Sequence, residues 1–336
     1  MLTLESLDSA RRRGADILGE IAGYGAANDS HHLTQPHPQG QAAVATMRAA
    51  AHAAGVTPSQ VGYTERTDSD GNAFRYLLSW VGGCDRFLPC DHRPSAFATY
   101  RFAITHPPDM TVRCPGTVTL PSATETVCDF AMGGGPTYST FGIVASDGWN
   151  VNNATWGGVA VEIFDRPTSD ISPLIDHERV SGFMNFMINQ FGPYPYGSAL
   201  RVLTGPTYWA GFEHPGNIVL ADDLDGPSLY ASPVNHTLMH EIAHQWAGDQ
   251  TTLANTRDFV WKEAMAEYLT YVYLDSVDAA SAATAPNAWK RFSVGSNYHP
   301  VPDDDVALID FYGDAYGPGP MILFRQLEAM SSRAQV

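Results

Sequence analysis

The stretch His240-Glu241-Ile242-Ala243-His244, followed after eighteen residues by Glu263, decides how this chain is interpreted. Two histidines four positions apart lie one turn apart on the same face of a helix, so both imidazoles can reach one metal ion. Glu241 stands between them and can face a metal-bound water. Glu263 can supply a third ligand from a second helix. Three protein ligands leave the fourth position of a tetrahedral zinc ion open for water, which is typical of a catalytic site. We therefore predict one bound Zn²⁺.

Two alternative interpretations of these histidines stay open at this point. They could be packing residues of a buried helix that happen to flank a glutamate. A second pair with the same spacing also exists, because His236 lies one turn before His240. No glutamate follows His236 directly, so we interpret it as a packing residue or as a residue that supports a ligand.

Length and composition exclude several classes of protein. The 336 residues suffice for two domains with a sizeable core, and 44% of them are hydrophobic. The net charge is −17 and no basic stripe is present, which argues against a nucleic-acid partner. No apolar run reaches the length of a membrane span. The first 25 residues lack the pattern of a signal peptide.

The four cysteines bear on the cellular compartment. Cys84, Cys90, Cys114 and Cys128 fall in a region of strand and loop character. The simplest of the three pairings is Cys84–Cys90 with Cys114–Cys128, and two disulfides would indicate an oxidising compartment and a secreted or extracytoplasmic parent. Four unpaired cysteines in the core are the alternative.

The chain changes character twice along its length. Residues 1–75 have no clear assignment, although segments 5–22 and 41–54 have the composition of helices. Residues 76–165 contain short β-branched and aromatic runs separated by Gly, Pro and Asp, the pattern of an antiparallel β domain. Residues 166–336 mix strands with helices.

The last region provides the framework for the metal ligands. Its sequence predicts a helix from residue 177 that stops at Gly192, strands at 199–205 and 216–222, and a final helix at 321–330. The ligand-bearing helices are predicted over 234–248 and 258–275. The fold class we expect is α+β.

Two further motifs stand at the places that peptide hydrolysis would need. The run 210–216, Ala-Gly-Phe-Glu-His-Pro-Gly, precedes a predicted strand. Its Glu213 could hold a charged amine, and the strand edge could receive an extended peptide. Tyr316, followed by Gly-Pro-Gly, could direct its hydroxyl at a developing oxyanion. Each motif alone also fits an ordinary turn or a packing residue.

Taken together, these motifs resemble the M1 family of zinc aminopeptidases, a group of gluzincins. The family pattern is H-E-x-x-H, eighteen residues, then E, with a G-[AG]-M-E-N motif before it and a Y-x-x-G tyrosine after it. All three occur here in order, the second with substitutions. The resemblance extends from about residue 80 to the C-terminus. It implies an N-terminal β domain followed by a thermolysin-like catalytic domain.

The resemblance assigns a role to each matching residue. His240, His244 and Glu263 match the zinc ligands, and Glu241 matches the general base. The amine-binding motif corresponds to Gly211, Glu213 and His214, in which Glu213 would bind the free α-amine of a peptide. Tyr316 matches the tyrosine at the oxyanion.

Several departures from the family pattern accompany these matches. His214 replaces the Asn of the amine-binding motif, and Phe212 replaces its Met. The usual N-E-G around the third ligand is Lys262-Glu263-Ala264 here. The family's C-terminal helical domain is expected to be absent from this chain.

The function predicted from the sequence is that of a zinc metallopeptidase, an aminopeptidase acting on peptides or proteins with a free N-terminus. An endopeptidase using the same metal site is the first alternative. An inactive binding module is the second, although such modules usually lose a ligand or the base. A separate prediction concerns Glu267, one turn after Glu263, which could accept a hydrogen bond from a ligand histidine or could simply face solvent.

Overall fold

The structure, a computed structural model, divides into two compact units, Met1–Val61 and Gly62–Val336. Each unit is described by itself below. The residues described are 5–15, 23–27, 41–54, 63–67, 70–78, 93–137, 139, 141–207, 209–224, 232–254, 259–295 and 319–336.

The first unit contains two described helices, α1 (Leu7–Arg12) and α2 (Gln41–Ala54). The side chain of Ser6 caps α1 by accepting a hydrogen bond from the backbone N–H of Ser9. The helix predicted over 5–22 therefore begins as expected, but it ends at Arg12, and Gly14 follows with a left-handed φ of +65°. The helix predicted over 41–54 is confirmed by α2.

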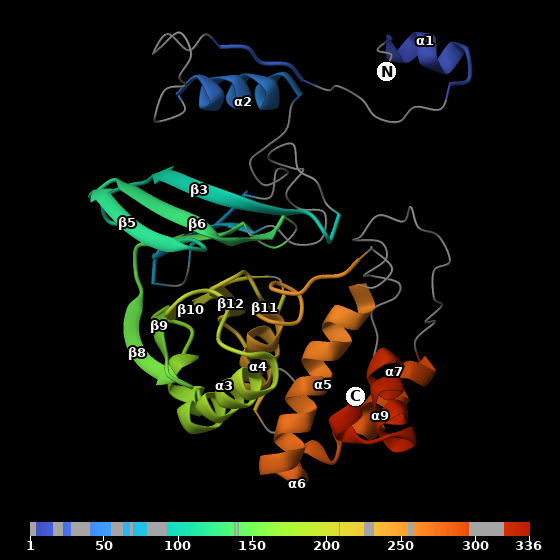
Figure 1. Ribbon diagram of the computed structural model, residues 1–336. Helices are drawn as coiled ribbons and strands as arrows, with labels where there is room; N and C mark the ends of the chain where they lie inside the picture. Colours follow the sequence, from blue (N-terminus) through green and yellow to red (C-terminus); the bar gives the residue numbers. More distant parts are fainter. Residues whose placement is uncertain are drawn as a thin grey trace. The chain divides into compact units, whose positions relative to one another are not determined.

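The second unit begins with two antiparallel sheets, as the β-branched runs predicted. The first has the strand order β1-β2-β7-β4. The second has the order β3-β6-β5, and these three strands are labelled in Figure 1. The strands are β1 (Tyr63–Thr67), β2 (Ala73–Leu78), β3 (Phe97–Thr105), β4 (Thr111–Arg113), β5 (Thr117–Ser122), β6 (Glu125–Pro136) and β7 (Gly142–Ser146).

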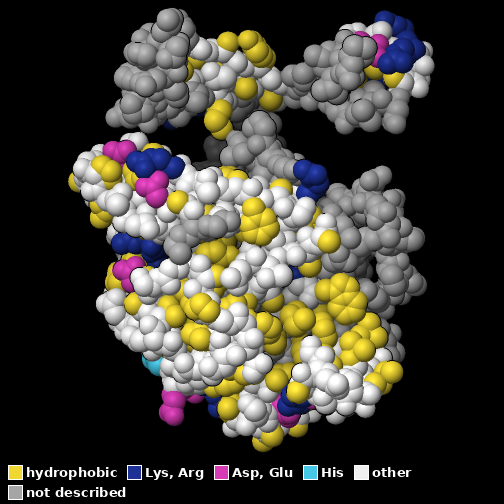
Figure 2. Space-filling model, in the orientation of Figure 1, with side chains coloured by type: hydrophobic (Ala, Val, Ile, Leu, Met, Phe, Trp, Pro, Cys, Tyr) yellow, Lys and Arg dark blue, Asp and Glu magenta, His cyan; other side chains and the backbone are white. Residues whose placement is uncertain are grey.

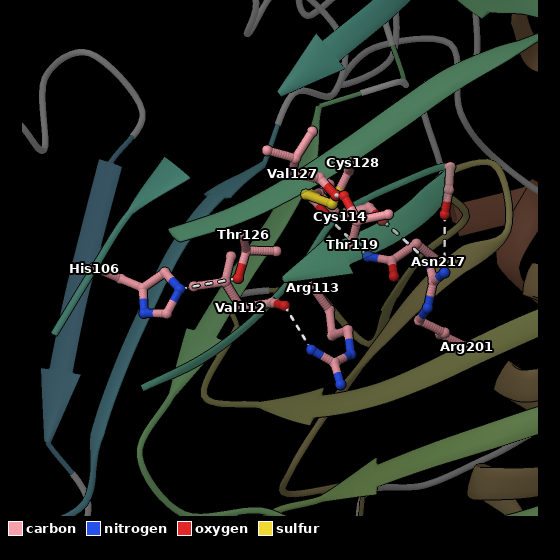
Figure 3. The surroundings of a disulfide bond; sticks show 12 residues. His106, Val112, Arg113, Cys114, Thr119, Thr126, Val127, Cys128, Arg201 and Asn217 are labelled. Atoms are coloured by element: carbon pink, nitrogen blue, oxygen red, sulfur yellow. Dashed lines mark hydrogen bonds between the residues drawn. A yellow bond between two sulfur atoms is a disulfide. The ribbon is translucent and has the colours of Figure 1, made fainter. Parts of the chain in front are cut away.

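A disulfide between Cys114 and Cys128 joins the end of β4 to β6, with the two Cα atoms 6.0 Å apart. Both cysteines are fully buried in a cluster with Phe102 and Phe141. Figure 3 shows Arg201 beside this bridge, where its guanidinium donates a hydrogen bond of 3.1 Å to the carbonyl of Cys114. The predicted pair Cys114–Cys128 is thus confirmed, whereas Cys84 and Cys90 lie outside the described residues.

A five-stranded mixed sheet follows, with the strand order β11-β12-β10-β9-β8. The inner strands β9, β10 and β12 run parallel, and β8 and β11 are antiparallel edges. The strands are β8 (Asn150–Trp156), β9 (Val159–Asp165), β10 (Ala199–Gly205), β11 (Gly211–Phe212) and β12 (Asn217–Ala221). All residues of β12 are buried, which explains its apolar sequence.

The predicted boundary between residues 165 and 166 falls directly after β9. Because β9 pairs with β10 on the other side of that boundary, one sheet continues through it. The domain boundaries at 75 and 165 therefore remain predictions.

Helices cover this sheet and carry the predicted ligands. In Figure 1, α3 and α4 lie against the sheet and α5 lies beside α4. Their shared core includes Val202 of β10, Phe183 of α3 and Ile242 of α4. The helices are α3 (His177–Phe191), α4 (Pro233–His244), α5 (Phe259–Val277), α6 (Ala279–Ala282), α7 (Ala285–Gly295) and α9 (Gly319–Met330), with short 3₁₀ turns at Ser172–Leu174 and Arg333–Gln335.

The ends of α3 agree with the sequence prediction, whereas the end of α4 does not. Asp176 caps α3 through the N–H of Arg179, and Gly192, with a φ of +93°, ends it as predicted. The helix predicted over 234–248 ends earlier, at His244. The chain turns there, so that the N–H of Asp249 donates to the carbonyl of His244.

The α+β class, with antiparallel sheets ahead of a mixed sheet covered by helices, is thus confirmed. No helix among the described residues is long and apolar enough to span a membrane. On the face drawn in Figure 2, the basic side chains form small separate groups.

Candidate metal centre

Helix α4 positions the two histidines. Ser232 begins the helix by accepting a hydrogen bond from the N–H of Asn235, and the fully buried Leu238 and Ile242 hold its other faces in the core. His240 and His244 then share the remaining face. Their Nε2 atoms are 3.1 Å apart, and their rings meet edge to face.

Helix α5 brings the third group to the same point. The Oε2 atom of Glu263 lies 3.3 Å from Nε2 of His240 and 3.4 Å from Nε2 of His244. A tetrahedral zinc ion with bonds of about 2.0–2.1 Å separates its ligand atoms by about 3.3 Å. The three donor atoms therefore fit a zinc ion without rearrangement, and their two-nitrogen, one-oxygen set suits that metal.

The carboxylates around His240 dominate its electrostatics. Burial alone would lower the pKa of His240, but Glu263 and Glu267 outweigh that effect and raise it to about 10. The positive charge of Lys262, together with His244 and His240, holds the pKa of Glu263 well below its usual value, against the effect of burial. A carboxylate-rich site of this kind attracts a cation.

Glu241 is buried beside the ligands and next to Gly211. Burial, reinforced by the negative charges of Glu213 and Glu263, raises the pKa of the Glu241 carboxyl to about 8. A Cβ atom on Gly211 would lie 2.3 Å from Oε1 of Glu241. Position 211 therefore has to be glycine for Glu241 to keep this place.

Glu213 follows the edge strand β11 and is only 2% exposed. Its Oε1 accepts hydrogen bonds from Lys262 Nζ at 2.8 Å and from Ser139 Oγ at 3.1 Å. Burial would raise the pKa of Glu213, but the positive charge of Lys262 contributes to an overall lowering to about 2. Glu213 is thus an ionised carboxylate.

These groups line one cavity of about 250 Å³. It contains the three predicted metal ligands, Glu241, Gly211 and Glu213. Its lining consists of Trp209, Ala210, Gly211, Phe212, Glu213, His236, Thr237, His240, Glu241, His244, Glu263 and Glu267.

His214 occupies a different environment. It is fully buried, its Nδ1 lies 2.6 Å from the carbonyl of Ser139, and its ring stacks on Phe212. A Cβ atom on Gly142 would lie 2.4 Å from the same ring. His214 is absent from the lining of that cavity. Its assignment as a substrate-binding residue, like those of Gly211 and Glu213, stays a prediction. Tyr316 lies outside the described residues.

Three supporting side chains were not identified from the sequence. Lys262 and Ser139 hold Glu213, as described above. Gln245 holds the backbone of the same segment, because its amide donates to the carbonyl of Glu213 at 2.5 Å and accepts from the N–H of Gly216 at 2.8 Å. The unusual Lys before the third ligand was the one available signal; nothing in the sequence marks the other two.

Two histidines and a glutamate on paired helices beside a mixed sheet form the arrangement of the gluzincin class of zinc metallopeptidases. Comparison with known families agrees with this class. Residues 177–307 match the model of the peptidase family M1 domain. These residues are therefore similar to the M1 peptidase domain, and the resemblance seen in the motifs is confirmed.

Solved structures of similar fold are M1 zinc metallopeptidases. One from Deinococcus radiodurans has a TM-score of 0.63 at 22% identity, covering 78% of this chain and 59% of that chain. A mutant form from the same organism, bound to a Tyr-Ser-Ala substrate, has a TM-score of 0.65 at 20% identity, covering 81% and 61%. A two-domain mutant form bound to L-tryptophan has a TM-score of 0.64 at 21% identity, again covering 81% and 61%. The chain thus spans about three-fifths of these proteins, and the likeness shows the fold.

The N-terminal region is similar to a different family. Residues 18–69 match the model of the β-ketoacyl synthase C-terminal domain. A 3-oxoacyl-acyl-carrier-protein synthase 2 of Staphylococcus aureus is 46% identical over 63 residues, which are 19% of this chain and 16% of that protein. A mitochondrial 3-oxoacyl-acyl-carrier-protein synthase of Arabidopsis thaliana is 43% identical over 63 residues, 19% of this chain and 14% of that protein. The region without an assignment from sequence reasoning thus has relatives, of which it spans about one sixth.

Proposed function

We propose that this protein is a zinc-dependent aminopeptidase that releases N-terminal residues from peptides. The observation that carries the proposal is the position of the Glu213 carboxylate in the same cavity as Glu241 and the three candidate ligands. An anionic group beside a hydrolytic centre binds the ammonium of an N-terminal residue and places the first peptide bond at that centre.

The residues His240, His244 and Glu263 would hold the metal. When bound there, zinc would polarise the scissile carbonyl and lower the pKa of a water molecule. Glu241 would act as the general base, its carboxylate accepting a proton from the attacking water and delivering it to the leaving amine. Tyr316 is proposed, from the family resemblance, to donate a hydrogen bond to the oxyanion.

Relatives of the same fold support a peptide substrate. Solved M1 metallopeptidases of this fold have been captured with a Tyr-Ser-Ala substrate, with L-tryptophan and with L-arginine. We infer that the cavity of this chain likewise takes the N-terminal residue of a peptide. The Cys114–Cys128 disulfide supports the further proposal of an oxidising, extracytoplasmic location for the parent protein.

One observation favours the endopeptidase alternative. Lys262 already provides Glu213 with a counter-ion, so Glu213 does not depend on a substrate amine for charge compensation. An endopeptidase would use the same zinc and Glu241 chemistry without the amine contact.

The test compares hydrolysis of fluorogenic amino-acid amides with that of their N-acetylated counterparts by the zinc-loaded protein. We expect the free-amine set to be cleaved faster, and Glu213→Ala to reduce that rate far more than the rate on blocked substrates. Equal or faster cleavage of the blocked set would replace the aminopeptidase with the endopeptidase. Cleavage of neither set would reject both.

A further inference from the structure

Lys262 lies between the proposed amine anchor and a proposed metal ligand. Its Nζ is 2.8 Å from Oε1 of Glu213 and 2.9 Å from Oε1 of Glu263. The side chain has no solvent exposure. The chain contains only two lysines, Lys262 and Lys290, and all its other basic residues apart from histidine are arginines.

The position of the ammonium is fixed by packing as well as by charge. A Cβ atom on Gly248 would lie 2.7 Å from Cε of Lys262, so the lysine stem passes directly over the turn that follows α4. Moving this buried ammonium would cost free energy, because the ammonium would lose both of its carboxylate partners.

The geometry on Glu213 determines what a substrate meets. Lys262 and Ser139 both donate to the same oxygen, Oε1. Among the described residues, no donor reaches Oε2, which is the oxygen left for a substrate amine. A substrate ammonium bound to Oε2 would therefore share the Glu213 carboxylate with Lys262. The nitrogen atoms of the two ammonium groups would then be about 5 Å apart.

The size of this repulsion can be estimated relative to the attraction of the substrate ammonium to Glu213. Coulomb energy falls as the inverse of distance, so repulsion at about 5 Å cancels about 60% of an attraction acting at about 3 Å. An N-acetylated substrate carries no charge at this position and experiences no such repulsion. Its amide N–H can still donate a hydrogen bond to Oε2.

We propose that Lys262 is a specificity-determining residue that lowers the preference of the site for a protonated N-terminus, so that N-acylated peptides are also accepted. The proposal rests on the proposed role of Glu213 as the amine anchor. It predicts a graded preference set by the Lys262–Glu213 pair rather than an absolute requirement for a free amine.

The test measures binding, in a background that does not turn substrate over. The zinc-loaded full chain carrying Glu241→Gln is titrated by calorimetry with leucine amide and with N-acetyl-leucine amide. The readout is the ratio of the two dissociation constants, which cancels differences in active protein. Lys262→Met keeps a side chain of similar length without the charge, and we expect it to raise the preference for the free amine at least tenfold. A ratio within about threefold of that of the Lys262 protein would overturn the proposal.

A second variant keeps the proposal testable if Lys262→Met fails to fold. Glu213→Gln removes the anchoring charge but retains Lys262, so the preference should invert in favour of the N-acetylated ligand. If Lys262 had no effect on specificity, Glu213→Gln would only remove the preference for the free amine, and the ratio of the two dissociation constants would be one. Retention of free-amine preference, or a ratio of one, in Glu213→Gln would therefore overturn the role of Lys262. The double variant should return the ratio to one.

Failure of the proposed function would look different. Cleavage by the protein with Glu241 intact tests the aminopeptidase activity, whereas the binding ratios test Lys262. Strong free-amine cleavage with an unchanged ratio in Lys262→Met would leave the function standing and reject this inference. Absence of cleavage together with a tenfold change in the binding ratio would reject the proposed function and leave the inference about Lys262 standing.

Discussion

The Nε2 atom of His236 lies 2.7 Å from Oε2 of Glu267. Nδ1 of His240 lies 3.4 Å from the same oxygen. One carboxylate on α5 thus joins two histidines that are one turn apart on α4. Because Nδ1 of His240 faces Glu267, its Nε2 is directed at the candidate metal position.

This relationship predicts that Glu267 supports zinc binding without being a ligand. Glu267→Ala should weaken zinc affinity by about 10–100-fold, the usual effect of removing a carboxylate that orients a ligand histidine. Competition with a chromophoric chelator measures the dissociation constant. Glu178→Ala, at an exposed position on α3, is the matched control and should leave zinc affinity unchanged. Equal affinities for the two variants would reduce Glu267 to a packing role.

The proposed base makes a different prediction. Glu241→Gln should lower kcat by about 10²–10⁴-fold, because the amide cannot accept the proton. Its zinc content should equal that of the unsubstituted protein, since Glu241 is outside the ligand set. Turnover and zinc content are measured on the same preparation. Appreciable residual turnover at full zinc occupancy would show that another group is the base.

Substitution of Gly211 should lower the catalytic rate because Gly211 contacts the proposed base, Glu241. A Cβ atom at this position would displace the Glu241 carboxylate, whose Oε1 would be only 2.3 Å away. Misplacement of a catalytic group by about 1 Å can cost about 10²-fold in rate. We therefore expect Gly211→Ala to lower kcat by that order with zinc content retained. An unchanged kcat would mean that Glu241 works from another position.

Sequence spacing predicted the metal centre because the helical period alone brings His240 and His244 together. Glu263 was predicted as the third ligand from its place on a second helix, after eighteen intervening residues from His244, and the family resemblance supported that assignment. The Lys262–Glu213 pair could not be predicted in this way. Those two residues are 49 positions apart, and their contact depends on how α5 packs against the end of β11.

Other features depended on contacts that no local pattern encodes. The motif containing His214 predicted a substrate contact, and that prediction stays untested. The contacts of its ring with Ser139 and Gly142, about 70 positions earlier in the chain, could not be predicted from the motif. Helix α4 ends at His244 rather than at 248 because the chain turns back at Gly248, whose φ is +146°. The helix-forming residues that precede Gly248 do not predict that turn.

The buried carboxyls give the metal-free protein opposite responses to acid and base. Glu213 has a folded pKa of about 2 against 4.5 for the ordinary carboxyl, so its stabilisation is present above 4.5 and is lost as pH falls from 4.5 toward 2. Glu241 has a folded pKa of about 8, so its contribution is present below 4.5 and is lost as pH rises from 4.5 to 8. For Glu213 the shift corresponds to about 3 kcal/mol.

We therefore expect the unfolding free energy of chelator-treated protein to be highest near pH 4.5, where the contribution of Glu213 is complete and that of Glu241 has not yet been lost. His240, with a pKa raised from 6.5 to about 10, adds to the loss on the alkaline side. Urea unfolding between pH 3 and 9 measures the profile. Glu213→Gln should flatten its acidic side and Glu241→Gln its alkaline side. Identical profiles for the two variants would contradict these assignments.

The Cys114–Cys128 disulfide should stabilise the β domain. It closes a loop with a sequence separation of 14 residues. Loss of such a cross-link costs about 3 kcal/mol through the entropy of the unfolded chain. The double variant Cys114→Ala, Cys128→Ala should therefore have a lower unfolding free energy by about that amount, with zinc affinity retained because the bridge lies outside the metal site. Chemical denaturation measures the loss. Treating the double variant with reductant measures the contribution of any other cysteine pair, and the additional loss on treating the unsubstituted protein measures that of this bridge. A double variant as stable as the unsubstituted, oxidised protein would show that neither the covalent bond nor the burial of these two sulfur atoms beside Phe102 stabilises this part of the fold.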